Sequence, residues 1–145
     1  MSVQSSPGVG LTPPADWRRR SVRRLRTIGG PHAPERVRAW IQSATDWLPD
    51  ELESNLLLLT SELVNNSVLH GEATEQDVIE IELRATQTGM RAQVTDPGEG
   101  FAPGGRDREI DEPGGWGLVL VEQLAASWGV ERDERTRVWF ELAAA

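Results

Sequence analysis

The chain has 145 residues, no cysteine and a formal net charge of −8 at pH 7. This length suits one domain with its own core. The lack of cysteine excludes disulfides and thiolate metal sites, and it fits a cytoplasmic protein. All fifteen basic residues are arginine, which excludes the phosphate-binding loop that ends in lysine and any lysine nucleophile. The acidic balance argues against a general nucleic-acid binder, and no apolar run is long enough to span a membrane.

The N-terminal stretch has almost no side chains that could form a core. It is rich in Ser, Pro and Gly, so we expect a disordered leader at residues 1–17 and a single domain at 18–145. Several arginines follow and overlap a first strand expected at 22–28. They could contact an acidic partner or nucleic acid. We favour the alternative, in which they form the solvated side of an edge strand and protect it from aggregation.

Two helices are predicted next, because the apolar residues recur at helical spacing. Pro34 suits the first position of the first helix, which is expected to end before Pro49. Its apolar residues are Val37, Trp40, Ile41, Ala44, Trp47 and Leu48. Asp50 suits the N-cap of the second helix, with Glu53 as its capping-box partner, and Gly71 ends that helix. The apolar stripe of the second helix is formed by Leu52, Leu56, Leu59 and Leu63.

The second helix also carries a polar stripe. Glu62, Asn66 and His70 follow one another four residues apart, which places them on one face beside the apolar stripe. A carboxylate, an amide and an imidazole are costly to bury without partners, so a polar group is expected against this edge. From this stretch alone, a functional site and a surface helix with polar boundary residues remain equally open.

An antiparallel hairpin is predicted after the helices, because the hydrophobic period changes to alternation. Its inward residues are expected to be Ile79, Ile81, Leu83 and Ala85 in one strand and Met90, Ala92 and Val94 in the other. The next inward position is Asp96, whose carboxylate needs a hydrogen-bond donor if it points into the protein. A simple turn at Asp96-Pro97-Gly98 is the alternative, and the alternation favours a site.

Residues 97–115 show no periodicity and hold six glycines and three prolines. A stretch of this kind is typical of a lid, a binding loop or a disordered segment. Arg106 and Arg108 lie in it and could reach a bound anion, although such mixed charges are usually solvated. The loop is expected to end at Gly114-Gly115-Trp116-Gly117, directly before a helix, where backbone amides favour phosphate.

The inner face of that helix is expected to consist of Leu118, Val121, Leu124 and Ala125. Two strands then complete the chain. Gly129 and Val130 begin the first of them, and the second has Val138, Phe140 and Leu142 facing inward.

Three polar sites therefore follow in order: the helical stripe at 62–70, the segment 96–100 after a strand, and the segment 115–118 before a helix. This order resembles the nucleotide-binding boxes of the histidine-kinase-like (GHKL) ATPase superfamily over roughly residues 20–142. The closest resemblance is to the small anti-sigma-factor serine/threonine kinases of actinomycete bacteria. It implies a Bergerat-type ATP-binding fold, an α+β two-layer sandwich with a mostly antiparallel sheet, helices on one face, and ATP between the helices and a lid.

The resemblance also implies a role for each matching residue. Glu62 matches the general base, Asn66 matches the Mg²⁺ ligand, and His70 matches a neighbour of the phosphates. Asp96 matches the carboxylate that accepts the adenine amino group. The glycines that lie close to the base and the lid match Gly98 and Gly100. The segment whose amides wrap the phosphates at the start of a helix matches Gly115, Trp116, Gly117 and Leu118. Two possible lid contacts are Arg106 and Arg108.

The chain departs from the family pattern at two positions. The family usually has a small apolar residue at the position of Ser67. Its last strand often opens with a threonine, but Arg137 stands at the matching position here and Thr136 comes one residue earlier.

The resemblance implies an ATP- and Mg²⁺-dependent serine/threonine kinase that regulates transcription. Its expected partners are an anti-sigma-factor antagonist, which it phosphorylates, and a sigma factor, which it holds; a homodimer is also expected, without direct contact to nucleic acid or membrane. Two alternatives remain open: a nucleotide-gated binding protein without kinase activity, and an ATPase module of another signalling assembly.

Overall fold

The computed structural model describes residues 11–19, 21–69, 74–97 and 116–144. They form a five-stranded sheet in the order β1-β2-β3-β5-β4, in which each neighbouring pair is antiparallel. The strands are β1 (Val22–Ile28), β2 (Val78–Ala85), β3 (Gly89–Asp96), β4 (Ser127–Arg132) and β5 (Thr136–Ala143). The helices are α1 (Ala15–Arg19), α2 (Ala33–Ala44), α3 (Asp50–Leu69) and α5 (Trp116–Leu124).

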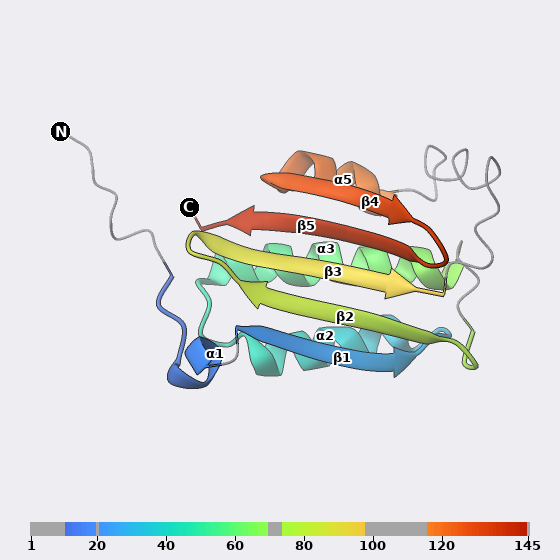
Figure 1. The fold of residues 1–145 in the computed structure, drawn as a ribbon, viewed down its shortest axis with the longest axis horizontal. Helices are drawn as coiled ribbons and strands as arrows, with labels where there is room; N and C mark the ends of the chain where they lie inside the picture. Colours follow the sequence, from blue (N-terminus) through green and yellow to red (C-terminus); the bar gives the residue numbers. More distant parts are fainter. Residues whose placement is uncertain (1–10, 20, 70–73, 98–115, 145) are drawn as a thin grey trace.

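The three longer helices, α2, α3 and α5, cover one face of the sheet (Figure 1). Helix α2 packs against β1, α3 packs against β3 and β5, and α5 packs against β4. The predicted two-layer α+β sandwich is therefore confirmed. The other face of the sheet carries no helix among the described residues, and none of the described helices is both long and apolar enough to cross a membrane.

The hairpin of β2 and β3 forms as predicted, with the expected residues facing inward. Ile81 pairs with Val94 and Leu83 pairs with Ala92, and all four side chains are buried on the helix-covered side. The amide of Thr86 donates to the carbonyl oxygen of Gly89 at 2.9 Å and closes the turn. Alternation predicted this hairpin because one of its faces is buried while the other is polar.

Helix α2 ends earlier than expected. It stops at Ala44 rather than just before Pro49, and Thr45 caps it by donating its amide to the carbonyl oxygen of Ile41. The hydroxyl of Thr45 lies 2.7 Å from the same carbonyl oxygen and 3.2 Å from Oε2 of Glu53. Side-chain bonds of this kind compete with helix continuation. Glu53, expected as a capping-box partner, thus contacts the end of α2.

The leader expected at residues 1–17 overlaps the folded domain. Residues 11–17 are described, and Trp17 on α1 is only 3% exposed. Its indole Nε1 donates to the carbonyl oxygen of Ala44 at 3.1 Å, and its ring centroid lies 5.5 Å from that of Trp47. Burial of a large aromatic ring fixes this segment although it contains two prolines and few apolar residues. Residues 1–10 lie outside the described part.

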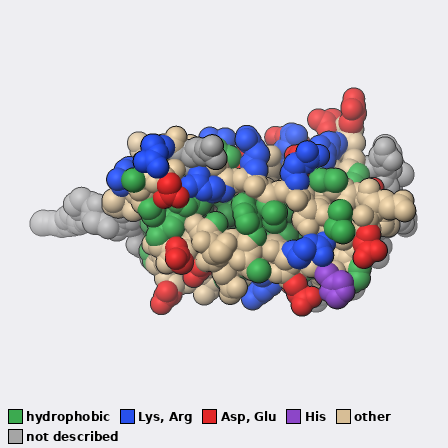
Figure 2. Space-filling model, turned by 90° about the horizontal axis from the view of Figure 1, so that it is seen from below, with side chains coloured by type: hydrophobic (Ala, Val, Ile, Leu, Met, Phe, Trp, Pro, Cys, Tyr) green, Lys and Arg blue, Asp and Glu red, His purple; other side chains and the backbone are tan. Residues whose placement is uncertain are grey.

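Arg24 and Arg26 of β1 point away from the helices and form ion pairs across the sheet. Arg24 lies 2.9 Å from Glu82, and Arg26 lies 3.2 Å from Glu80. Figure 2 views the molecule from the β1 and α2 side and shows arginines with acidic side chains among them. Arg23 instead points back to α1 and contacts Asp16 at 2.8 Å. These contacts agree with the favoured explanation, a solvated strand face.

Candidate functional site

Helix α3 positions its polar stripe on the flank that faces away from α2. Ser61 lies on the α2 side, because its Oγ is 3.3 Å from Nη1 of Arg38. Each residue turns the helix by about 100°, so Glu62 and Asn66 lie on the other flank, with exposed Leu58 between the two flanks. Since α3 packs between α2 and α5 (Figure 1), this flank is the one beside α5.

Glu62 and Asn66 are both half-buried at the boundary between the core and this flank. Their neighbours Leu59 and Leu63 are buried against the sheet, so these two residues of the predicted polar stripe lie beside the apolar one. The side chains of Glu62 and Asn66 are one helical turn apart. A carboxylate and an amide are thus placed together on a partly accessible edge.

Asp96 ends β3 and points inward, as the alternation predicted. It is 4% exposed, and its Oδ2 accepts a hydrogen bond from the hydroxyl of Ser67 at 2.7 Å. Ser67 lies on α3 one residue after Asn66 and is 5% exposed. The contact therefore joins the helix of the polar stripe to the end of the central strand. Sequence analysis named Ser67 only as a departure from the family pattern.

Thr136 is the second residue that sequence analysis did not place. It opens β5, is 5% exposed, and pairs directly with Asp96 in the β3–β5 ladder. Directly opposite residues of antiparallel strands have their Cβ atoms about 5 Å apart. The inward alternation of Val138 and Phe140, counted two residues back, is the signal that identifies Thr136 as an inward residue.

Ser67, Asp96 and Thr136 form what we call the Asp96 cluster. Three elements contribute to it, α3, β3 and β5, and all three side chains are at least nine-tenths buried. Polar groups are costly to bury in a core, so a cluster of this kind is more typical of a ligand site than of simple packing. A buried carboxylate suits a ligand that donates a hydrogen bond, such as an exocyclic amino group.

The family model of the histidine kinase-like ATPase domain matches residues 30–142. The chain belongs to this family. Membership implies that the domain binds ATP, usually with Mg²⁺. No curated protein matches the chain. The histidine kinase-like fold and the buried Asp96 cluster thus agree on a nucleotide as the ligand.

Several predicted residues of this histidine kinase-like domain cannot be placed. His70, Gly98, Gly100, Arg106, Arg108 and Gly115 lie outside the described residues. Their assignments stay predictions. The described part brings together Glu62 and Asn66 on one flank of α3, and Asp96 joins the same helix through Ser67.

The helix expected after the glycines starts earlier than predicted. Helix α5 begins at Trp116, so Trp116, Gly117 and Leu118 form its first turn instead of preceding it. The first amides of a helix have no partner within the helix and can bind an anion, so this turn still suits the phosphates that the family implies. The predicted inner face is correct at Val121, which is fully buried, but Leu124 is 39% exposed.

The donor set around Glu62 fits a magnesium ion that comes with the nucleotide. The described residues contain no group of three or more His, Asp or Glu side chains that could hold a metal by themselves. Mg²⁺ in nucleotide sites needs only one or two protein oxygens, because phosphates and water supply the others. The amide oxygen of Asn66 is the side-chain ligand that the family resemblance assigns.

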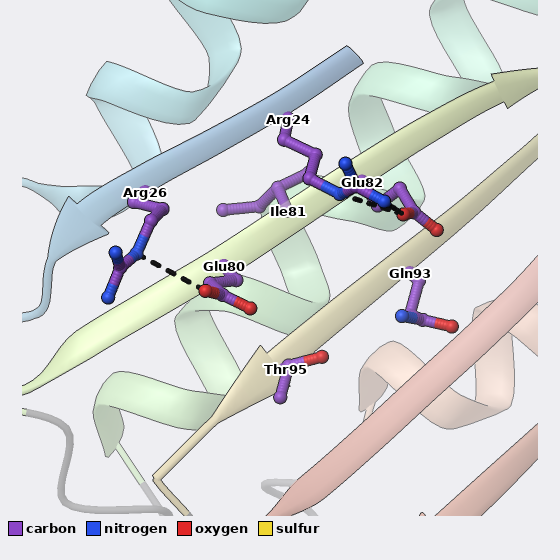
Figure 3. Close-up of a pocket in the computed structure, with 7 residues that line it drawn as sticks. All are labelled: Arg24, Arg26, Glu80, Ile81, Glu82, Gln93 and Thr95. Carbon is purple, nitrogen blue, oxygen red and sulfur yellow. Dashed lines mark hydrogen bonds and ion pairs between the residues drawn. The ribbon is translucent and has the colours of Figure 1, made fainter. Parts of the chain in front are cut away.

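A small pocket lies on the face of the sheet opposite the helices (Figure 3). It is lined by Arg24, Arg26, Glu80, Ile81, Glu82, Gln93 and Thr95 and has a volume of about 40 Å³. That space suits a few water molecules. Its charged side chains are already in ion pairs, and it is separated from the Asp96 cluster by the sheet itself. This pocket is therefore not the nucleotide site.

Proposed function

We propose that this chain is an ATP-dependent serine/threonine protein kinase that acts as an anti-sigma factor in the cytoplasm. Its acceptor is an anti-sigma-factor antagonist protein, and it holds a sigma factor once the antagonist is phosphorylated. A homodimer is part of the proposal. Neither nucleic acid nor membrane is a direct partner.

The observation that carries the proposal is the position of Glu62 on α3. It lies half-buried on the flank beside α5, one turn before Asn66. Ser67 follows five residues after Glu62, which is about 7.5 Å along the helix axis, and it joins α3 to Asp96. One helix thus serves both ends of an ATP molecule, with the nucleobase near Asp96 and the phosphates nearer Glu62. A protein that only binds ATP has no need for a carboxylate at the phosphate end.

In the proposed reaction, Glu62 accepts the proton of the acceptor hydroxyl. The hydroxyl oxygen bonds to the γ-phosphorus while the bond from that phosphorus to the bridging oxygen of ADP breaks, and ADP leaves with the electron pair. Asn66 would hold Mg²⁺, which supplies positive charge next to the phosphates. Because the chain has no lysine, other positive charge at the phosphates must come from arginine and backbone amides.

Phosphotransfer tests the role of Glu62. The wild-type protein, Glu62→Ala and Asn65→Ala are incubated with γ-labelled ATP and candidate antagonist proteins. We expect Glu62→Ala to lower the rate by at least about 100-fold, the usual contribution of a general base, while its ATP affinity, measured by calorimetric titration, stays within a few-fold. Asn65→Ala is the matched control, because Asn65 is also half-buried on α3 but lies nearer the α2 flank.

Different outcomes separate the competing functions. An unchanged rate in Glu62→Ala overturns the catalytic role. ATP binding without a labelled product for any acceptor would support a nucleotide-gated binding protein. Hydrolysis of ATP without a protein acceptor would support an ATPase module.

A further inference from the structure

Ser67 is the feature of the site that the proposed function does not explain. A small apolar residue at this position could not donate a hydrogen bond. Here the hydroxyl of Ser67 contacts Oδ2 of Asp96 at 2.7 Å. That distance is typical of a hydrogen bond donated by a hydroxyl to an oxygen.

The contact between Ser67 and Asp96 is buried. Ser67 is 5% exposed and Asp96 is 4% exposed, so bulk water has little access to either side chain. A hydrogen bond that is lost in such a place is not readily replaced by one to bulk water. Ser67 also sits on a long helix packed against the sheet, which fixes the position of its oxygen.

We infer that Ser67 is a positioning residue that makes the site selective for a 6-aminopurine. Its hydroxyl holds one oxygen of Asp96 and fixes the carboxylate plane, so that the remaining acceptor capacity of Asp96 is directed at the amino group of adenine. This inference rests on the proposed function, because it requires that Asp96 recognises the nucleobase of ATP.

The same hydrogen bond works against a 6-oxopurine such as guanine. Ser67 has one hydroxyl hydrogen, and that hydrogen is donated to Asp96. It is therefore not available to the carbonyl oxygen that guanine carries in place of the amino group. A site that leaves polar groups of its ligand unpaired rejects that ligand strongly.

The test compares two nucleotides that differ only in the amino group. ATP and purine riboside triphosphate, which has the same ring without the 6-amino group, are titrated with Mg²⁺ into wild type, Ser67→Ala and Ser61→Ala. We expect Ser67→Ala to weaken ATP binding about tenfold, as for loss of a charge-assisted hydrogen bond. The affinity for purine riboside triphosphate should change less than twofold. Ser61→Ala, a buried serine of α3 that bonds Leu58 and Arg38, should change neither.

A merely structural role gives a different result. If Ser67→Ala weakens both nucleotides equally, or neither, the inference is overturned. If wild type binds neither nucleotide, the proposed function itself fails, so the two failures can be told apart. Ser67→Cys keeps the side-chain shape but donates a hydrogen bond only weakly; it should show the same selective loss of ATP affinity, and it replaces the alanine variant if that variant does not fold.

Discussion

Some buried polar side chains in this domain affect only its stability, whereas others belong to the candidate site. Thr45 and Thr60 are both fully buried, but the hydroxyl of Thr45 is bonded at the end of α2, whereas that of Thr60 has no hydrogen-bond partner among the described residues. The Asp96 cluster is different again, because a buried carboxylate is far costlier than a hydroxyl. At the scale of single residues, the buried carboxyl group of Asp96 marks the candidate site, while the two threonines concern stability alone.

Replacement by valine is expected to change the free energy of unfolding in opposite directions at the two threonines. Thr60→Val removes a buried hydroxyl without a partner, and we expect the free energy of unfolding to rise by about 1 kcal/mol. Thr45→Val removes a hydroxyl that bonds the carbonyl oxygen of Ile41, and we expect a fall of about 1–2 kcal/mol. Urea unfolding followed by circular dichroism measures both. Equal effects of the same sign would show that side-chain shape, and not hydrogen bonding, decides stability at these positions.

Helix α3 contributes to both the hydrophobic core and the candidate site. Its leucines pack on β3 and β5, its flank beside α5 carries Glu62 and Asn66, and Ser67 on its buried face contacts Asp96. Strands β3 and β5 bring Asp96 and Thr136 to the same place because the two residues are register partners. The Asp96 cluster is therefore held by three packed elements, and its geometry depends on how they dock.

Helix α1 belongs to the opposite end of the domain. Figure 1 shows it at the end of the sheet away from the C-terminal end of β3, where Asp96 lies. Arg23 stacks over the ring of Trp17 at 4.5 Å from its centroid, so the indole is covered on several sides. A short helix of this kind has little stability of its own, and its attachment depends on that one aromatic ring.

Trp17→Ala should therefore destabilise the domain without affecting the nucleotide site. We expect the free energy of unfolding to fall by about 3 kcal/mol, as for loss of a buried aromatic ring. Trp17→Phe keeps most of the apolar area but loses the bond to Ala44, and a fall of about 1 kcal/mol is expected. Urea unfolding gives these values, and ATP titration below the unfolding transition should give wild-type affinity. A weaker affinity in Trp17→Ala would mean that α1 is coupled to the site.

At the scale of the whole molecule, the two faces of the sheet carry different kinds of side chains. The helix-covered face holds the core and the Asp96 cluster, while the other face consists of paired charges and of Trp139, which packs over Gly129 and under the guanidinium of Arg91 at 4.2 Å. A side chain at Gly129 would clash with the indole ring, whose Nε1 would lie 2.7 Å from the added Cβ. Ion pairs and a flat indole cover this sheet face, and the Asp96 cluster lies on the other side.

Periodicity predicted most of this architecture but only part of the site. The hairpin of β2 and β3 and the inward direction of Asp96 followed from alternation, and the leucine stripe of α3 followed from helical spacing, because one face of each element is buried. The contact of Ser67 with Asp96 joins residues 29 positions apart, and it depends on how α3 docks on the sheet. Trp17 gave no signal either, since one apolar residue in a proline-rich stretch has no period.

Ligand binding should stabilise the whole domain through the Asp96 cluster. A ligand at 100 times its Kd adds about 2.7 kcal/mol to the free energy of unfolding. For a domain of 145 residues this corresponds to a rise in Tm of about 8 °C. We expect that rise for ATP with Mg²⁺ in wild type, and a much smaller one in Asp96→Asn at the same concentration, because the amide replaces one acceptor oxygen by a donor. Differential scanning calorimetry measures both, with GTP as the control nucleotide. An equal rise in Asp96→Asn would place the nucleobase away from β3, and the buried cluster would then have to be explained as packing alone.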